Sequence, residues 1–259
     1  MSAVFGVPVD AAYHLVFALA NVLTPVLGGF AAVAGIILFT AAVRLAVTPL
    51  TFSALRGQAA QARLAPHVRR LRERYGKQPE RLQRELTALY RREGTSIFAG
   101  FGPLLAQWPV FSVIYLLFRS PVIAGGPNRL LSHDLFGVSL GAHWLSGGGL
   151  ASVQGAVFIG VLALLGAACW LLARAARSMS GVIAPAPAQP QKKKAAAAAA
   201  VPSTPGMPGW LVKALPYLTV GIAAFAPLAA VIYLITSTAW SAGERLVFTA
   251  RARARAGAR

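Results

Sequence analysis

Long apolar segments alternate with charged segments along the chain. A helix crosses a bilayer with about 20 apolar residues, and three segments are apolar over that length: 26–50, 100–118 and 150–173. A fourth apolar region, 210–248, is too long for one span, and Pro227 stands near its middle. Proline removes a backbone donor and clashes with the preceding turn, so this region predicts a hairpin of two short spans, at about 212–225 and 228–247. The pattern therefore predicts five spans.

The charged segment after the first span has a helical pattern of its own. It places apolar side chains on two stripes: Leu64, Val68, Leu71 and Tyr75, then Leu82, Leu86 and Leu89. Between the stripes, Gly76 is a signal for a helix end and Pro79 is a signal for a helix start. The pattern predicts a helical hairpin zipped by its apolar stripes. A merely solvated basic loop is the alternative.

Two other segments have a recognisable pattern. The stretch 10–24 places apolar side chains on one helical face: Val16, Leu19, Ala20 and Leu23. This face predicts an amphipathic helix that lies along the outer membrane interface ahead of the first span. Residues 178–209 are rich in Pro and Ala and carry a run of Lys. Such a composition buries too little apolar surface to fold, which predicts a disordered linker.

Composition and charge place the apolar segments in a membrane. The 259 residues are 56% hydrophobic and only 12% charged, which is too apolar for an ordinary soluble domain. The net charge is +18, and eleven basic residues lie in 52–99 while two lie in 119–149. The segment 174–209 and the tail after residue 248 are also basic. Because basic loops stay in the cytoplasm, five spans put the amino terminus outside and the carboxyl terminus in the cytoplasm.

The chain carries no recognisable catalytic or metal-binding pattern. The seven acidic residues lie outside the predicted spans or near their ends, and the four histidines lack metal-ligand spacing. His133 and Asp134 are neighbours, which a loop coincidence explains better than a catalytic pair does. The single cysteine, Cys169, allows no intramolecular disulfide. We therefore expect no enzyme activity, no cofactor and no metal.

One charge falls inside a predicted span. Arg44 lies 12 residues before the next basic residue, Arg56, which is about 18 Å along a helix. If Arg56 marks the membrane boundary, Arg44 lies near the bilayer centre, where a charge costs at least about 2.5 kcal/mol. No acidic residue deep in the spans is available to neutralise it. Arg44 therefore predicts a hydrated pocket.

Polar side chains in the spans are candidates for the walls of that pocket. Intramembrane polar groups normally face a bundle interior or a water-filled cavity, although single Thr and Ser residues are also common packing groups between helices. Thr40 and Thr48 lie one helical turn on either side of Arg44. With Arg44, the predicted site comprises Thr40, Thr48, Gln107, Gln154, Thr219, Tyr233, Thr236, Ser237 and Trp240. Gln107 is equally well explained as a structural hydrogen-bonding group.

Four stretches, in this order and spacing, resemble the YidC-type membrane protein insertases. They are the arginine followed by Pro-Leu in VRLAVTPL (43–50), the hairpin end ELTALYRREG (85–94), the span with Gln-x-Pro in GPLLAQWPVFSVIY (102–115), and the Pro-turn with Tyr, Thr-Ser and Trp in APLAAVIYLITSTAW (226–240). Ser96 and Ile97 stand where the family usually has Asn-Pro. The chain thus resembles a divergent bacterial member.

The resemblance implies an all-α polytopic membrane protein of the bacterial plasma membrane. Five transmembrane helices would surround a hydrophilic groove that is open to the cytoplasm and contains Arg44, and a helical hairpin would lie in the cytoplasm. The implied activity is the insertion and folding of nascent membrane proteins without nucleotide hydrolysis. Nascent clients are the implied partners, with the ribosome and the Sec translocon as further candidates, and no small-molecule substrate is expected. The basic tail suits ribosomal RNA or anionic lipids equally well.

The expected boundaries follow from these patterns. In chain order they are an interfacial segment, 1–25; span 1, 26–51; the cytoplasmic hairpin, 52–99; span 2, 100–119; an extracellular loop, 120–149; span 3, 150–173; the linker, 174–211; span 4, 212–226; span 5, 227–248; and the basic tail, 249–259.

Two other classes of protein remain as alternatives. A small anion transporter or channel would use Arg44 as its binding residue, although the internal repeats that favour a transporter are not evident. A structural assembly factor without insertase action is the other rival, and it would tolerate the loss of Arg44.

Overall fold

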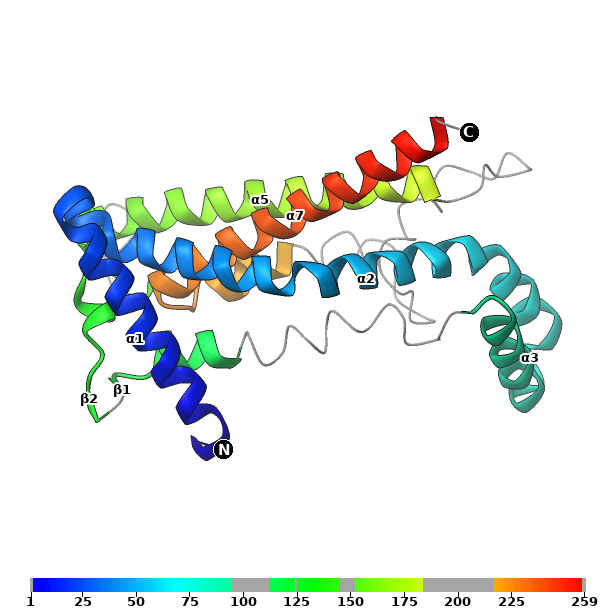
Figure 1. The fold of residues 1–259 in the computed structure, drawn as a ribbon, viewed down its shortest axis with the longest axis horizontal. Helices are drawn as coiled ribbons and strands as arrows, with labels where there is room; N and C mark the ends of the chain where they lie inside the picture. The colour runs from blue at the N-terminus through cyan, green and yellow to red at the C-terminus, as the bar shows by residue number, and fades with distance from the viewer. Residues whose placement is uncertain (1, 95–111, 124, 145–151, 184–216, 258–259) are drawn as a thin grey trace. The chain divides into compact units, whose positions relative to one another are not determined.

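The computed structural model describes residues 2–94, 112–123, 125–144, 152–183 and 217–257, which are mostly helical (Figure 1). The chain divides into two compact units. Unit 1 comprises Met1–Ala46, Gln107–Ala173 and Ala214–Ala242, and unit 2 comprises Val47–Ala106, Arg174–Lys213 and Gly243–Arg259. Residues 100–111 of the predicted second span and most of the predicted linker lie outside the described residues.

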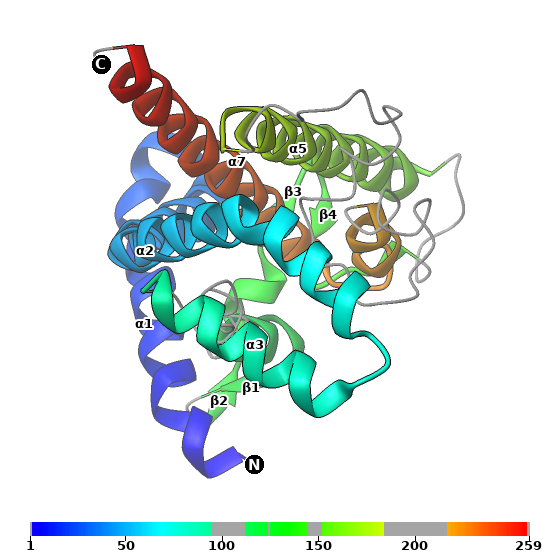
Figure 2. The same ribbon diagram turned by 90° about the vertical axis from the view of Figure 1, so that its right-hand side faces the viewer.

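The helices and short strands follow one another in a simple order. The helices are α1 (Ser2–Leu27), α2 (Ala31–Tyr75), α3 (Pro79–Arg92), α5 (Val153–Ile183) and α7 (Leu228–Gly257), with shorter helical stretches at 112–119 and 217–223 and 3-10 turns at η1 (Gly28–Phe30) and η2 (Arg129–Ser132). The strands are β1 (Val122–Ile123), β2 (Gly126–Pro127), β3 (Asp134–Leu135) and β4 (Val138–Ser139). In unit 1, α1 lies beside β1 (Figures 1 and 2).

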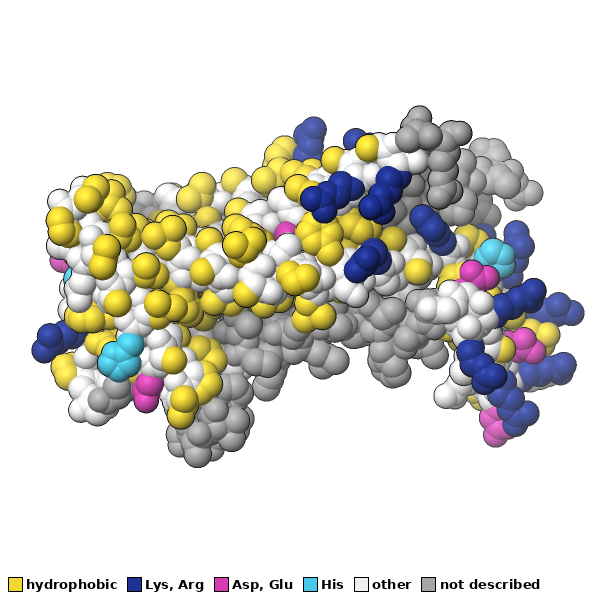
Figure 3. Space-filling model, in the orientation of Figure 1, with side chains coloured by type: hydrophobic (Ala, Val, Ile, Leu, Met, Phe, Trp, Pro, Cys, Tyr) yellow, Lys and Arg dark blue, Asp and Glu magenta, His cyan; other side chains and the backbone are white. Residues whose placement is uncertain are grey.

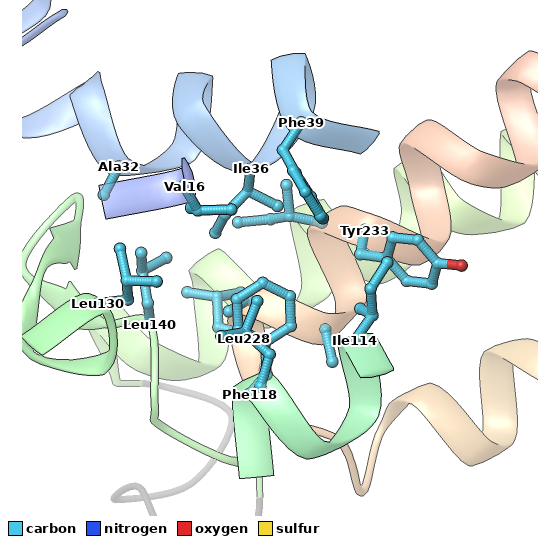
Figure 4. Close-up of a cluster of buried hydrophobic side chains, with 14 of the residues drawn as sticks. Val16, Ala32, Ile36, Phe39, Ile114, Phe118, Leu130, Leu140, Leu228 and Tyr233 are labelled. Carbon is cyan, nitrogen blue, oxygen red and sulfur yellow. The ribbon is translucent and has the colours of Figure 1, made fainter. Parts of the chain in front are cut away.

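The main core of unit 1 gathers apolar side chains from most of its elements. Val16 of α1, Ile36 of α2 and Leu228 of α7 meet there with side chains from the helix 112–119 and from the loop that follows it (Figure 4). Val16 and Ala20, on the predicted apolar face of this helix, are buried in the unit 1 core. That the helix lies along the outer membrane interface stays a prediction. The helix itself is longer than the predicted stretch 10–24.

The predicted loop 120–149 contains a folded element, which we call the loop cap (residues 120–142). Two antiparallel hairpins form it, with Ile123 opposite Gly126 and Leu135 opposite Val138. Leu130 and Leu140 are fully buried in the unit 1 core. The sequence did not predict these strands, because two-residue strands are too short to produce an alternating pattern.

The loop cap also completes the start of α7. The first N–H groups of a helix have no partner within the helix, and here those of Leu228 and Ala229 donate to the carbonyls of Ala142 and Leu140, at 3.0 and 2.9 Å. Pro227 precedes α7 directly, which confirms the predicted helix break at this residue. The cap and the proline together fix where α7 begins.

Asn128 holds the loop cap together, and its replacement should destabilise it. The buried Asn128 amide donates to the carbonyls of Leu117 and Ser120, at 2.7 and 3.1 Å, and its oxygen accepts from the N–H of Leu130, at 3.2 Å. Asn128→Ala leaves these buried backbone groups without their partner, so we expect a loss of about 2–3 kcal/mol in the free energy of unfolding. Denaturation of the purified protein in detergent measures it. Ser132→Ala, at an exposed position of the same loop, is the control and should change little.

Unit 2 is built from the ends of the long helices and from α3. The helix α2 ends at Tyr75 and α3 begins at Pro79, as Gly76 and Pro79 predict. The guanidinium groups of Arg74 and Arg81 lie over the Tyr75 ring, 5.6 and 5.2 Å from its centroid. Of these cation–π contacts, the one from Arg81 joins α3 to the end of α2.

Two helices of unit 2 continue beyond the segment boundaries that the sequence predicts. No break separates residues 51 and 52, since α2 continues through Pro49 and Pro66. The helix α7 continues to Gly257, where a basic tail was expected from residue 249. A small apolar cluster joins α2, α5 and α7 in this unit: Leu55, Ala59, Ala62, Met179 and Phe248. This tertiary packing stabilises the helical conformation of the polar helix ends.

Candidate functional site

Arg44 makes the central polar contact of unit 1. It is half-buried in α2 and donates a hydrogen bond from Nη2 to the Oγ of Ser237 in α7. Ser237 is only 4% exposed. The site therefore pairs a guanidinium with a buried hydroxyl between two helices of one unit.

Most other hydroxyl groups near this pair are bonded within their own helices. Thr40 donates to the carbonyl of Ile36 at 2.7 Å, and Thr236 donates to that of Ile232 at 3.0 Å. In an apolar helix, Thr and Ser commonly satisfy their hydroxyl groups by such hydrogen bonds to a backbone carbonyl one turn earlier. Thr40 is in fact almost fully buried, at 1% exposure.

Two aromatic residues flank the pair along α7. Tyr233 is buried in the core, and its hydroxyl points away from the apolar cluster (Figure 4). Trp240 is half-buried. Both stand within one turn of Ser237, so the α7 face of the predicted site is present as a continuous stripe.

Unit 2 contains a second polar contact between α2 and α7. Thr48 donates to Oε1 of Glu244 at 2.8 Å, and Glu244 is buried, at 7% exposure. The predicted site includes Thr48 but not Glu244, which the sequence places near a span end. The signal was available, since Glu244 continues the α7 stripe one turn after Trp240.

Removing the Thr48 donor should destabilise unit 2. A buried carboxylate that loses a hydrogen bond bears part of its desolvation cost, so we expect Thr48→Val to lower the free energy of unfolding by about 1–2 kcal/mol. Chemical denaturation in detergent measures this change. Thr51→Val is a matched control on the same helix, because Thr51 donates only to its own helix, to the Val47 carbonyl. Equal effects of the two substitutions would contradict a special role for the Glu244 contact.

The remaining predicted site residues are Gln154, Thr219 and Gln107. Gln154, in the first turn of α5, donates to the carbonyl of His143 at 2.7 Å. Thr219 is half-buried in the helix 217–223. Gln107 lies outside the described residues. Their assignment to the site stays a prediction.

The surface and the long helices suit a membrane protein. Among the described residues, two helical stretches are long and apolar enough to cross a membrane, Gly6–Tyr75 and Val153–Met179, and each contains an 18-residue segment with a mean hydropathy of 2.3 and 2.5, respectively. The helix α7 is not among them. On the face seen in Figure 3, hydrophobic side chains cover much of α1 and the first turns of α2, and Lys and Arg gather around α3. Across the described residues, no three His, Cys, Asp or Glu side chains group as metal ligands would.

Comparison with known proteins decides the family. The family described as "60Kd inner membrane protein" matches residues 22–255. The chain belongs to this family, which is the YidC family. Proteins named membrane protein insertase YidC are among its relatives: the one from Granulibacter bethesdensis is 36% identical over 104 residues, and the one from Acidiphilium cryptum is 38% identical over 101 residues. The Helicobacter pylori protein of that name is 34% identical over 101 residues.

These YidC relatives are much longer than the region that they share with this chain. The matched region is 40% of the chain but only 18% of the Granulibacter protein, and 39% of the chain but 17% of the Acidiphilium protein. The family match over most of the chain confirms the resemblance found in the sequence. It also agrees with a mostly helical protein with apolar helices, and in the described parts of the chain the structure is mostly helical apart from four short strands.

Proposed function

We propose that this YidC-family chain is a membrane protein insertase and folding helper that works through a hydrated groove lined by α2 and α7. The observation that carries the proposal is the hydrogen bond from Arg44 to the buried Ser237. A guanidinium among apolar helices is costly unless polar groups or water surround it. Arg44 lies in such a place, and Ser237 supplies part of the polar surrounding.

The groove would act by lowering the cost of moving a polar client segment partway across the bilayer. A client's polar or acidic extracellular segment enters from the cytoplasm, and Arg44 replaces part of its lost hydration with a charge-assisted hydrogen bond. The apolar segment of the client then moves into lipid along the outside of the helices. Burial of roughly 25 cal/mol per Å² of apolar surface drives that movement, so no nucleotide, cofactor or metal is required.

The proposal includes the arrangement in the membrane. Five spans surround the groove, with the amino terminus outside and the carboxyl terminus in the cytoplasm of a bacterial cell. The hairpin of α2 and α3 then receives clients in the cytoplasm. The arginines at the end of α7 contact ribosomal RNA or anionic lipid, and the Sec translocon is a further partner. The distribution of basic residues along the chain supports this orientation.

Complementation tests the proposed activity. Cells depleted of their own insertase receive this protein, and the insertion of a single-span client with an acidic extracellular tail is scored by protease accessibility. Rescue by the wild-type protein is the expected result. Failure of a well-expressed protein to rescue, together with anion uptake by vesicles that contain it, would instead support the rival transporter.

A further inference from the structure

The turn between β3 and β4 has an unusual residue at its tip. Phe136 and Gly137 form a two-residue hairpin turn, and both have positive φ angles, 53° and 78°. Turns of this kind favour Asn-Gly, and a bulky residue is disfavoured in the left-handed region. Phe136 is the one described residue other than glycine with a positive φ. An aromatic residue thus occupies a position whose backbone conformation favours Asn or Gly.

The Phe136 side chain does not pack into the interior of the loop cap. It is 68% exposed, whereas Leu135 and Val138 on either side of the turn are buried. Its ring makes an edge-to-face contact with Phe30 in η1, at a centroid distance of 5.3 Å, and Phe30 is itself exposed. Val26, in the last turn of α1, is 82% exposed. An exposed apolar tip therefore forms from the ends of α1, η1 and the β3–β4 turn, and we call Val26, Phe30 and Phe136 the apolar tip.

The apolar tip is continuous with the apolar outer surface of α2. Two turns beyond Phe30, Ile37 and Leu38 are exposed, and Leu45 follows two turns later on the same side of the helix. In a membrane protein, an exposed apolar stripe of this length on a spanning helix faces lipid. The tip extends that stripe beyond the start of α2, so we expect the same medium to surround the stripe and the tip. Lipid is favoured over a protein partner because the exposed side chains are apolar in the stripe and remain apolar where the tip begins.

We propose that the apolar tip inserts into the acyl chains of one leaflet, the outer leaflet in the proposed topology, and anchors the loop cap to the bilayer. The rings of Phe30 and Phe136 lie just below the headgroups, at the depth where amphipathic elements bury their apolar faces. Through Leu135 and Val138 the anchored turn holds the cap, and the carbonyls of Leu140 and Ala142 hold the start of α7. The bilayer surface thereby positions the outer end of the α7 helix. This inference stands independently of the insertase activity.

Spin labels at the tip test the depth of insertion. Phe136→Cys and, separately, Phe30→Cys are made in a Cys169→Ala background, since Cys169 is the only natural cysteine, and the nitroxide-labelled full chain is reconstituted into phospholipid vesicles. Collision with oxygen, which partitions into acyl chains, is compared with collision with a water-soluble nickel chelate. Ser132→Cys, at an exposed position of the same loop, is the matched control.

The expected result is that oxygen relaxes the labels at positions 136 and 30 more than the nickel chelate does, by several-fold, with the reverse order at position 132. A label at position 136 that responds to nickel as strongly as the one at 132 would place the tip in water and overturn the proposal. Low access to both reagents at 136 and 30 would show that protein covers the tip, which would overturn it as well.

Discussion

Replacing Arg44 by alanine should slow the insertion of a single-span client with an acidic tail by roughly tenfold to a hundredfold. The substitution removes a charge-assisted hydrogen bond worth about 1.5–3 kcal/mol, and each 1.4 kcal/mol corresponds to about a factor of ten in rate. The measurement is the fraction of client whose tail becomes accessible to protease outside the cell, followed over time in cells that depend on this protein.

Two further variants separate charge from structure in that experiment. Arg44→Lys keeps the positive charge and should retain most of the activity. Arg56→Ala removes an exposed arginine from the same helix and should leave insertion near the wild-type rate. If the Arg44→Ala protein inserted the client as fast as the wild type does, Arg44 would be dispensable for this client, and a scaffold that lacks insertase action would become the better account.

Replacing Phe158 by alanine should destabilise unit 1 by about 3–5 kcal/mol, the usual cost of emptying a buried aromatic site. Phe158 is fully buried in the core, and its ring makes an edge-to-face contact with Trp144 at a centroid distance of 6.0 Å. The alanine variant loses both the packing of the ring and this aromatic contact. Denaturation of the purified protein in detergent measures the change in the free energy of unfolding.

The neighbouring residue provides the control for this prediction. Ile159 lies next to Phe158 in α5 but is exposed, at 46%, so Ile159→Ala should change the stability by no more than about 0.5 kcal/mol. Comparable losses for the two variants would mean that α5 packs on a different face from the one described.

Local signals were sufficient for much of the helical framework. Gly76 and Pro79 predicted the turn between α2 and α3, and Pro227 predicted the start of α7, because these residues act on the backbone of their immediate neighbours. The buried face of α1 followed from the spacing of Val16 and Ala20. The helix α2 continues past residue 51, where the first span was expected to end, because a change from apolar to charged side chains does not end a helix by itself.

The site depended more on contacts between distant residues. The polar faces of α2 and α7 were visible in the sequence, but that Arg44 meets Ser237 rather than Thr236 is set by how the helices are rotated against each other. Thr40 was predicted to line the groove because its side chain is polar. In the structure its hydroxyl donates to the Ile36 carbonyl within α2. Glu244 was not included in the site because the sequence places it near the end of a span, and its hydrogen bond with Thr48 joins residues far apart in the chain.

The most direct test of the proposed groove places a photo-crosslinker in it. A benzophenone amino acid replaces Trp240, one turn beyond Ser237 on α7, or in the control replaces Trp170, which is exposed on α5. Ribosomes with a stalled single-span client are then irradiated in membranes that contain either protein. The account predicts a crosslink from position 240 to the polar tail of the client and none to that tail from position 170. No crosslink to the tail from position 240, while client insertion proceeds, would contradict a groove beside Arg44.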